Sequence, residues 1–81
     1  MRLMRKDIVA PPGGVMTDEV GVVTGDLTLE TIVDPASPCV VSLRVQYKDA
    51  AEWYKVTDAE IKVDDPAKVA EAERALLSRF G

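Results

Sequence analysis

Residues 39–63 read CVVSLRVQYKDAAEWYKVTDAEIKV and contain the longest run of β-forming residues, both tyrosines and the only tryptophan. Apolar side chains from Val41 to Tyr47 alternate with polar ones, which is the period-2 pattern of a strand with one buried face. A polar break at residues 48–52 separates this run from a second β-rich one. The pattern therefore predicts an antiparallel hairpin with strands over about 39–47 and 53–63.

The end of this hairpin fits two templates. Thr57 and Glu60 have the spacing of a helix capping box, so a helix start is one interpretation. Ile61 and Val63 are β-branched and Pro66 follows closely, which favours a strand. We expect the strand to continue to residue 63.

Two further strands are predicted before the hairpin. The first covers residues 20–24 and the second, with clear alternation, residues 27–33. Gly25-Asp26 between them suits a two-residue hairpin turn, because glycine readily takes the positive φ of primed turns. The prolines at 35 and 38 exclude a central strand from the loop that follows.

The N-terminal segment is less regular. Residues 3–9 are predicted to form an edge strand, since charges at Arg5, Lys6 and Asp7 discourage pairing with other chains. The run Pro-Pro-Gly-Gly at 11–14 ends this strand. Residues 15–19 are interpreted as loop.

Residues 66–80 carry the clearest helix signal. Asp65 is a good N-cap and Pro66 suits the first helical position. One apolar stripe recurs at helical spacing and is made by Val69, Ala72, Leu76, Leu77 and Phe80. We expect this stripe to dock on the sheet.

The predicted fold is α+β: one domain over residues 1–81, with a four- or five-stranded antiparallel sheet, mostly a meander, and one C-terminal helix. A strongly bent sheet or a partly closed barrel is the main variant. A single helix can cover only one face of such a sheet, so Trp53 and Tyr54, adjacent in the chain, are expected on opposite faces with only one of them largely buried.

Composition limits the class of protein. The chain has 81 residues, a net charge of −4, one cysteine and no histidine. The unpaired Cys39 fits a reducing compartment, and no apolar run approaches the length that spans a bilayer, so a cytoplasmic protein without a membrane segment is expected. Residues 11–38 carry five acidic residues and no basic one, which weakens any nucleic-acid interpretation.

No residue pattern indicates catalysis. The glycines lack the lysine and serine of a phosphate loop, and without histidine the usual serine triad is absent. Asp64-Asp65 is open to two interpretations, a site for a hard cation or a helix cap, and we favour the cap. We therefore expect no enzyme, no cofactor and no metal.

The best candidate site is a group of aromatic and basic residues near the central hairpin, namely Arg44, Tyr47, Trp53, Tyr54 and Lys55. Such residues are typical of protein-binding hot spots, and also of platforms on which single-stranded nucleic acid stacks. The plainer alternative is that they divide between the core and scattered surface positions.

The expected function is that of a small non-enzymatic interaction or regulatory protein that binds another protein. The alternative is a nucleic-acid-binding module that uses the basic N-terminus and the aromatic hairpin. Self-association as a homodimer is also expected, because one helix about 10–12 Å wide leaves much of a sheet roughly 15–20 Å wide uncovered. Closed two-fold symmetry is the commonest form of self-association.

Overall fold

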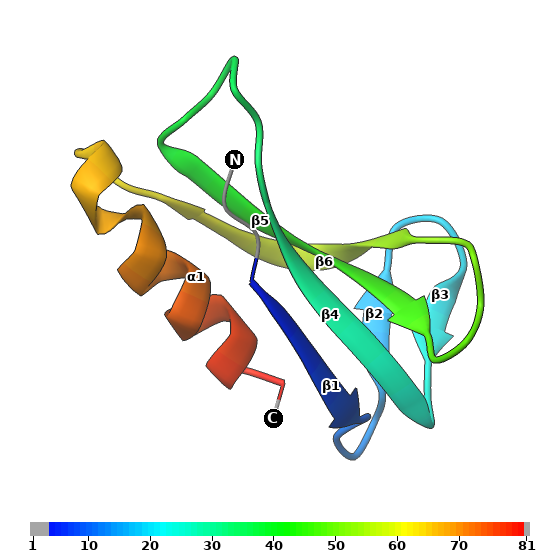
Figure 1. The fold of residues 1–81 in the computed structure, drawn as a ribbon. Coiled ribbons are helices and arrows are strands. Elements are labelled where there is room, and N and C mark those ends of the chain that lie inside the picture. The colour runs from blue at the N-terminus through cyan, green and yellow to red at the C-terminus, as the bar shows by residue number, and fades with distance from the viewer. Residues whose placement is uncertain (1–3, 81) are drawn as a thin grey trace.

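The computed structural model describes residues 4–80, which form an antiparallel six-stranded sheet and one C-terminal helical segment (Figure 1). The α+β class is therefore confirmed, with more strands than the four or five expected. The strands are β1 (Arg5–Val9), β2 (Val15–Thr17), β3 (Gly21–Val23), β4 (Asp26–Val33), β5 (Val40–Tyr47) and β6 (Tyr54–Lys62). A 3₁₀ turn, η1 (Pro66–Lys68), leads into α1 (Val69–Ser78).

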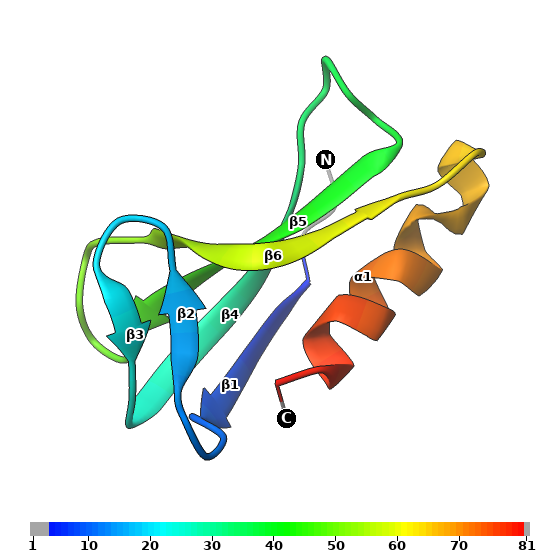
Figure 2. The same cartoon turned by 180° about the vertical axis from the view of Figure 1, so that it is seen from behind.

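The sheet order is β1-β4-β5-β6-β2-β3, so only β4, β5 and β6 form the expected meander. Strands β3 and β4 follow each other in the chain but lie four positions apart in the sheet. In a flat sheet those positions are about 19 Å apart, whereas the three Cα steps from Val23 to Asp26 span at most about 11 Å. The sheet must therefore bend, and Figure 2 shows the β2–β3 pair turned across the end of the longer strands.

Two predictions for the N-terminal half are wrong. Residues 15–17, interpreted as loop, form β2, and β3 pairs with β2 rather than with β4. Gly25-Asp26 is thus a link between distant sheet positions and not a hairpin turn. A three-residue strand is too short to show alternation in the sequence. Which strand it pairs with depends on how the sheet bends.

The central hairpin is confirmed, because β5 pairs antiparallel with β6. The register shifts between Ser42 and Arg44, whose partners are Glu60 and Lys55, so β6 contains a bulge. Within the bulge Asp58 has a φ of 57°, in the left-handed region that aspartate tolerates better than most residues. The bulge lets the first half of β6 also contact β2, through Val56 and Thr17.

One face of the sheet packs against α1, and we call it the inner face. Its core side chains come from all six strands and the helix: Ile8, Val15, Val23, Leu27, Leu29, Val41, Leu43, Val45, Val56, Ala59, Ala72, Leu76 and Leu77. Within the described residues 4–80, the opposite, outer face has no helix over it (Figures 1 and 2). It carries the alternate residues of each strand.

The helix begins where the sequence predicts. Asp65 accepts a hydrogen bond from the Ala67 N–H at 2.9 Å, and Pro66 occupies the first turn. The first turn is 3₁₀ and α1 ends at Ser78, two residues before the predicted end. Of the predicted stripe, Ala72, Leu76 and Leu77 are buried, whereas Val69 and Phe80 are half-buried beside the core.

Candidate interaction surface on the outer sheet face

A row of charged residues crosses four strands of the outer face. The register aligns Arg5 of β1 with Glu30 of β4, Glu30 with Arg44 of β5, and Arg44 with Lys55 of β6. Directly opposed residues of antiparallel strands share a face, so these four side chains are neighbours. Their alternation with buried Leu29 and the other core residues places them on the side away from α1.

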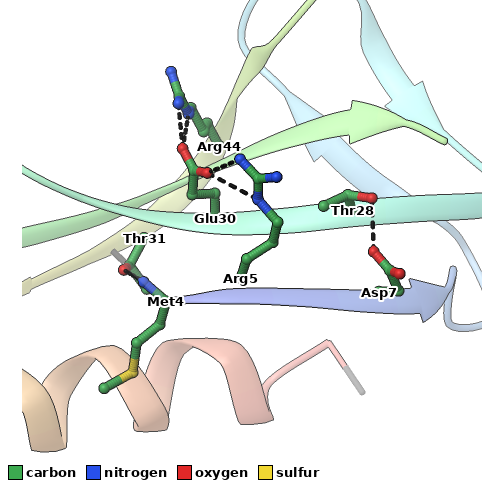
Figure 3. Close-up of polar contacts among 7 residues, drawn as sticks. All are labelled: Met4, Arg5, Asp7, Thr28, Glu30, Thr31 and Arg44. Atoms are coloured by element: carbon green, nitrogen blue, oxygen red, sulfur yellow. Dashed lines mark hydrogen bonds and ion pairs between the residues drawn. The ribbon is translucent and has the colours of Figure 1, made fainter. Parts of the chain in front are cut away.

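Glu30 is the centre of this row. Its side chain is only 1% exposed, and two arginines hold it (Figure 3). Arg5 donates from Nε and Nη2 to Oε2 at 3.0 and 2.5 Å. Arg44 donates from Nε to Oε1 at 2.7 Å and from Nη2 to the same oxygen. Each carboxylate oxygen thus accepts two hydrogen bonds from one guanidinium group.

The electrostatics keep Glu30 ionised. Burial acts to raise the pKa of this carboxyl, but hydrogen bonds from Arg5 and Arg44, together with their charges, outweigh it. The pKa of Glu30 is therefore lowered from its ordinary value. A buried carboxylate with two charge-assisted partners holds both guanidinium groups in fixed positions.

Trp53 covers the arginines. Its ring centroid lies 4.4 Å from Cζ of Arg44 and 5.6 Å from Cζ of Arg5, within the range of cation–π attraction. We call Arg5, Glu30, Arg44 and Trp53 the Glu30 cluster. Trp53 precedes β6 and is half-buried, so the arginines, rather than the apolar core, supply its packing surface.

The five residues predicted as a site divide between the two faces. Arg44, Trp53 and Lys55 lie together on the outer face. Tyr47 and Tyr54 are paired with Leu27 and Val45 of the inner face. Trp53 and Tyr54 thus point to opposite faces as expected, and both have intermediate exposure, so neither is fully buried.

Tyr54 instead belongs to a small polar group at the sheet end. Its hydroxyl donates to Glu52 Oε2 at 3.1 Å. This hydrogen bond, with smaller contributions from burial and nearby acidic charge, raises the pKa of Tyr54.

Sequence reasoning missed Arg5 and Glu30. The available signal was Glu30 itself, which is the only charged residue of 27–33 and lies between apolar or β-branched neighbours. A charge at such a position requires a cross-strand partner. Arg5 could not be identified as one of the partners, because β1 and β4 are not consecutive in the chain and no local pattern predicts that they pair.

Asp64 and Asp65 both take part in contacts at the start of the helical segment. Asp65 caps the helix segment, and Asp64 pairs with Lys68 at 2.9 Å. Among residues 4–80, no three side chains from His, Cys, Asp and Glu are grouped so as to hold a metal ion. Cys39 is half-buried, directly before β5.

The chain matches no protein-family model, no curated protein and no solved structure. The helical segment within residues 4–80 is too short and too polar to cross a membrane.

Proposed function

We propose that this chain is a small non-enzymatic interaction protein that binds another protein through its outer sheet face. The observation that carries the proposal is the Glu30 cluster, in which a buried carboxylate fixes two arginines beneath a tryptophan. Tryptophan and arginine are the residues most enriched among interface hot spots. A cluster that is already rigid loses little conformational entropy when a partner binds.

The surface suits a partner with carboxylate or carbonyl oxygens. Arg5 and Arg44 both bind Glu30 through Nε and Nη2, which leaves Nη1 of each guanidinium for another acceptor. Their side chains are 61% and 35% exposed. Lys55 adds a third positive charge, so the row has a net positive charge within an acidic protein. We place this binding in the cytoplasm, in line with the unpaired cysteine.

The alternative of a nucleic-acid-binding module has less support. A stacking platform needs several aromatic rings on one surface. Trp53 lies on the outer face, whereas Tyr47 and Tyr54 lie on the inner one. The net charge of −4 also opposes phosphate binding.

Self-association as a two-fold dimer is part of the proposal. Met16 and Val22 form a cross-strand pair on the β2–β3 hairpin and are 50% and 47% exposed. Strand β3 is an edge of the sheet, and its backbone can pair with a second copy. We propose this edge as the dimer contact.

The partner-binding proposal is tested by affinity capture from the native host. The wild-type chain, Trp53→Ala and Lys62→Ala serve as baits, since Lys62 is an exposed residue of β6 outside the cluster. We expect a partner that the wild type and Lys62→Ala retain and Trp53→Ala loses. Identical capture by all three baits would contradict binding through the cluster.

A further inference from the structure

A groove lies between the end of the sheet and the start of the helical segment, away from the Glu30 cluster. Val33 and Pro35 form one wall, and Pro66, Ala67, Val69 and Ala70 form the other. Its volume is about 570 Å³, within the range of sites that hold small molecules. The walls are apolar, and Glu73 is the one charged side chain that lines the groove among residues 4–80.

Glu73 is a buried carboxylate of α1, only 1% exposed. It takes a core-facing position beside Ala72, Leu76 and Leu77. Its Oε2 accepts a hydrogen bond from Oγ1 of Thr31 at 2.5 Å. The Thr31 hydroxyl in turn accepts from the backbone N–H of Met4 at 3.0 Å, so the hydroxyl is fixed between the two.

Glu73 lines the groove, and its second oxygen, Oε1, is not used within the described part of the chain. Oε1 has no hydrogen-bond partner within residues 4–80, yet no fully buried side-chain oxygen or nitrogen there lacks one. Oε1 is therefore not sealed in the core, and the groove that Glu73 lines is the open space beside it.

The two buried glutamates of the protein differ in their compensation. Glu30 has two arginine partners, whereas Glu73 pairs with no cation among residues 4–80. A buried carboxylate is costly unless a positive charge or several hydrogen bonds compensate it, and one hydroxyl is weak compensation. The groove thus combines apolar walls with a buried carboxyl group that has no cationic partner among residues 4–80.

We propose that the groove binds an organic cation, an ammonium group on a short apolar body. The ammonium group donates to Oε1 of Glu73. The apolar body lies between the wall made by Val33 and Pro35 and the wall made by residues 66–70. Acidic residues next to the walls favour the same sign of ligand, since Asp34 directly precedes Pro35 and Asp65 directly precedes Pro66. Lys68, the basic residue between Ala67 and Val69, is already paired with Asp64.

The test is a titration of the full chain with three probes of one length: hexylammonium, hexan-1-ol and hexanoate. Backbone amide shifts of Ala67, Val69 and Ala70 in ¹⁵N–¹H spectra report binding. We expect saturable shifts with hexylammonium, at least about tenfold weaker binding of hexan-1-ol, and no binding of hexanoate.

Two variants locate the charge that binds. Glu73→Gln keeps the size of the side chain and is expected to weaken hexylammonium at least about tenfold. Glu71→Gln, an exposed glutamate of the same helix, is the matched control and is expected to bind as the wild type does. If Glu73→Gln does not fold, Ala70→Phe, which fills the groove from a half-buried position, is expected to abolish binding instead.

A fourth probe, N-acetyl-lysine methylamide, separates the two sources of ammonium. Binding of this probe as tight as that of hexylammonium assigns the site to a lysine side chain of a protein. If hexylammonium binds and this probe does not, the site is assigned to a free amine.

Three results would overturn the proposal. Equal binding of hexan-1-ol and hexylammonium would make the groove merely apolar. Unchanged binding in Glu73→Gln, or no amide shifts with any probe, would remove the cation site. Binding of hexylammonium to the Arg2→Ala variant but not to the wild type would mean that Arg2, which lies outside the described residues, already neutralises Glu73.

Discussion

The guanidinium of Arg44 lies 4.4 Å from the ring centroid of Trp53 while its Nε donates to Glu30 at 2.7 Å. The tryptophan thus packs on a charge that is itself fixed by a buried carboxylate. This relationship explains how a large aromatic ring is ordered on the outer face of the sheet, opposite α1. It also makes the stability of the outer face dependent on pH.

Glu30→Gln is expected to lower the free energy of unfolding by about 2 kcal/mol near neutral pH, because the arginines lose their anionic partner. The folded state holds the pKa of Glu30 below its ordinary value. Its stabilisation is therefore complete above the ordinary glutamate pKa, about 4.3, and is lost as pH falls through the lowered folded value.

Urea unfolding of both proteins at about pH 7 and about pH 2.5 measures this effect. The difference between wild type and variant is expected to shrink at the lower pH. A difference that stays the same would mean that the ion pairs do not contribute to folding.

Gly14 and Gly13 provide a matched pair of backbone variants. Both have positive φ, 75° and 89°, so alanine is strained at either position. A Cβ on Gly14 would lie 2.4 Å from Cγ1 of Val22 and 2.8 Å from the carbonyl oxygen of Val23, whereas at Gly13 it meets nothing within 4 Å. Gly14→Ala should destabilise the protein by at least about 2 kcal/mol more than Gly13→Ala. Equal losses in chemical denaturation would refute the close approach of residue 14 to β3.

Leu76→Ala tests whether α1 is an integral part of the fold. Leu76 is fully buried in the core between helix and sheet. Its truncation is expected to cost about 2–5 kcal/mol, measured by denaturant titration. A loss below about 0.5 kcal/mol would mean that the helix is an appendage.

Val22→Lys tests self-association through the β2–β3 edge. A charge on an edge strand opposes pairing with another chain. Sedimentation equilibrium at micromolar concentration is expected to give a dimer for the wild type and an 8.8 kDa monomer for the variant. A wild-type protein that is monomeric under these conditions excludes the proposed dimer.

Local signals in the sequence predicted the elements that depend on neighbours in the chain. Asp65 and Pro66 located the helix start, and the alternation after Val40 located β5 and its hairpin with β6. The sheet order could not be predicted this way. It depends on the bend of the sheet, because only a bent sheet lets β3 and β4 be consecutive in the chain and yet lie four positions apart in the strand order.

The same limit applies to the site. Arg44, Trp53 and Lys55 were predicted together because they lie near the same hairpin in the sequence. Arg5 comes from β1, which joins β4 across two intervening strands of sequence, so its contact with Glu30 is invisible to any local pattern. Tyr47 and Tyr54 were grouped with Trp53 because they are close in the chain, whereas the strand pairing places both tyrosines on the inner face and Trp53 on the outer one.

The affinity of the captured partner for Trp53→Ala, measured by calorimetry with purified proteins, tests binding through the Glu30 cluster most directly. A hot-spot tryptophan contributes at least about 2 kcal/mol, so the dissociation constant should rise about 30-fold or more. Lys62→Ala should change it less than about twofold. Equal affinities of Trp53→Ala and the wild type would contradict a partner-binding role for this surface.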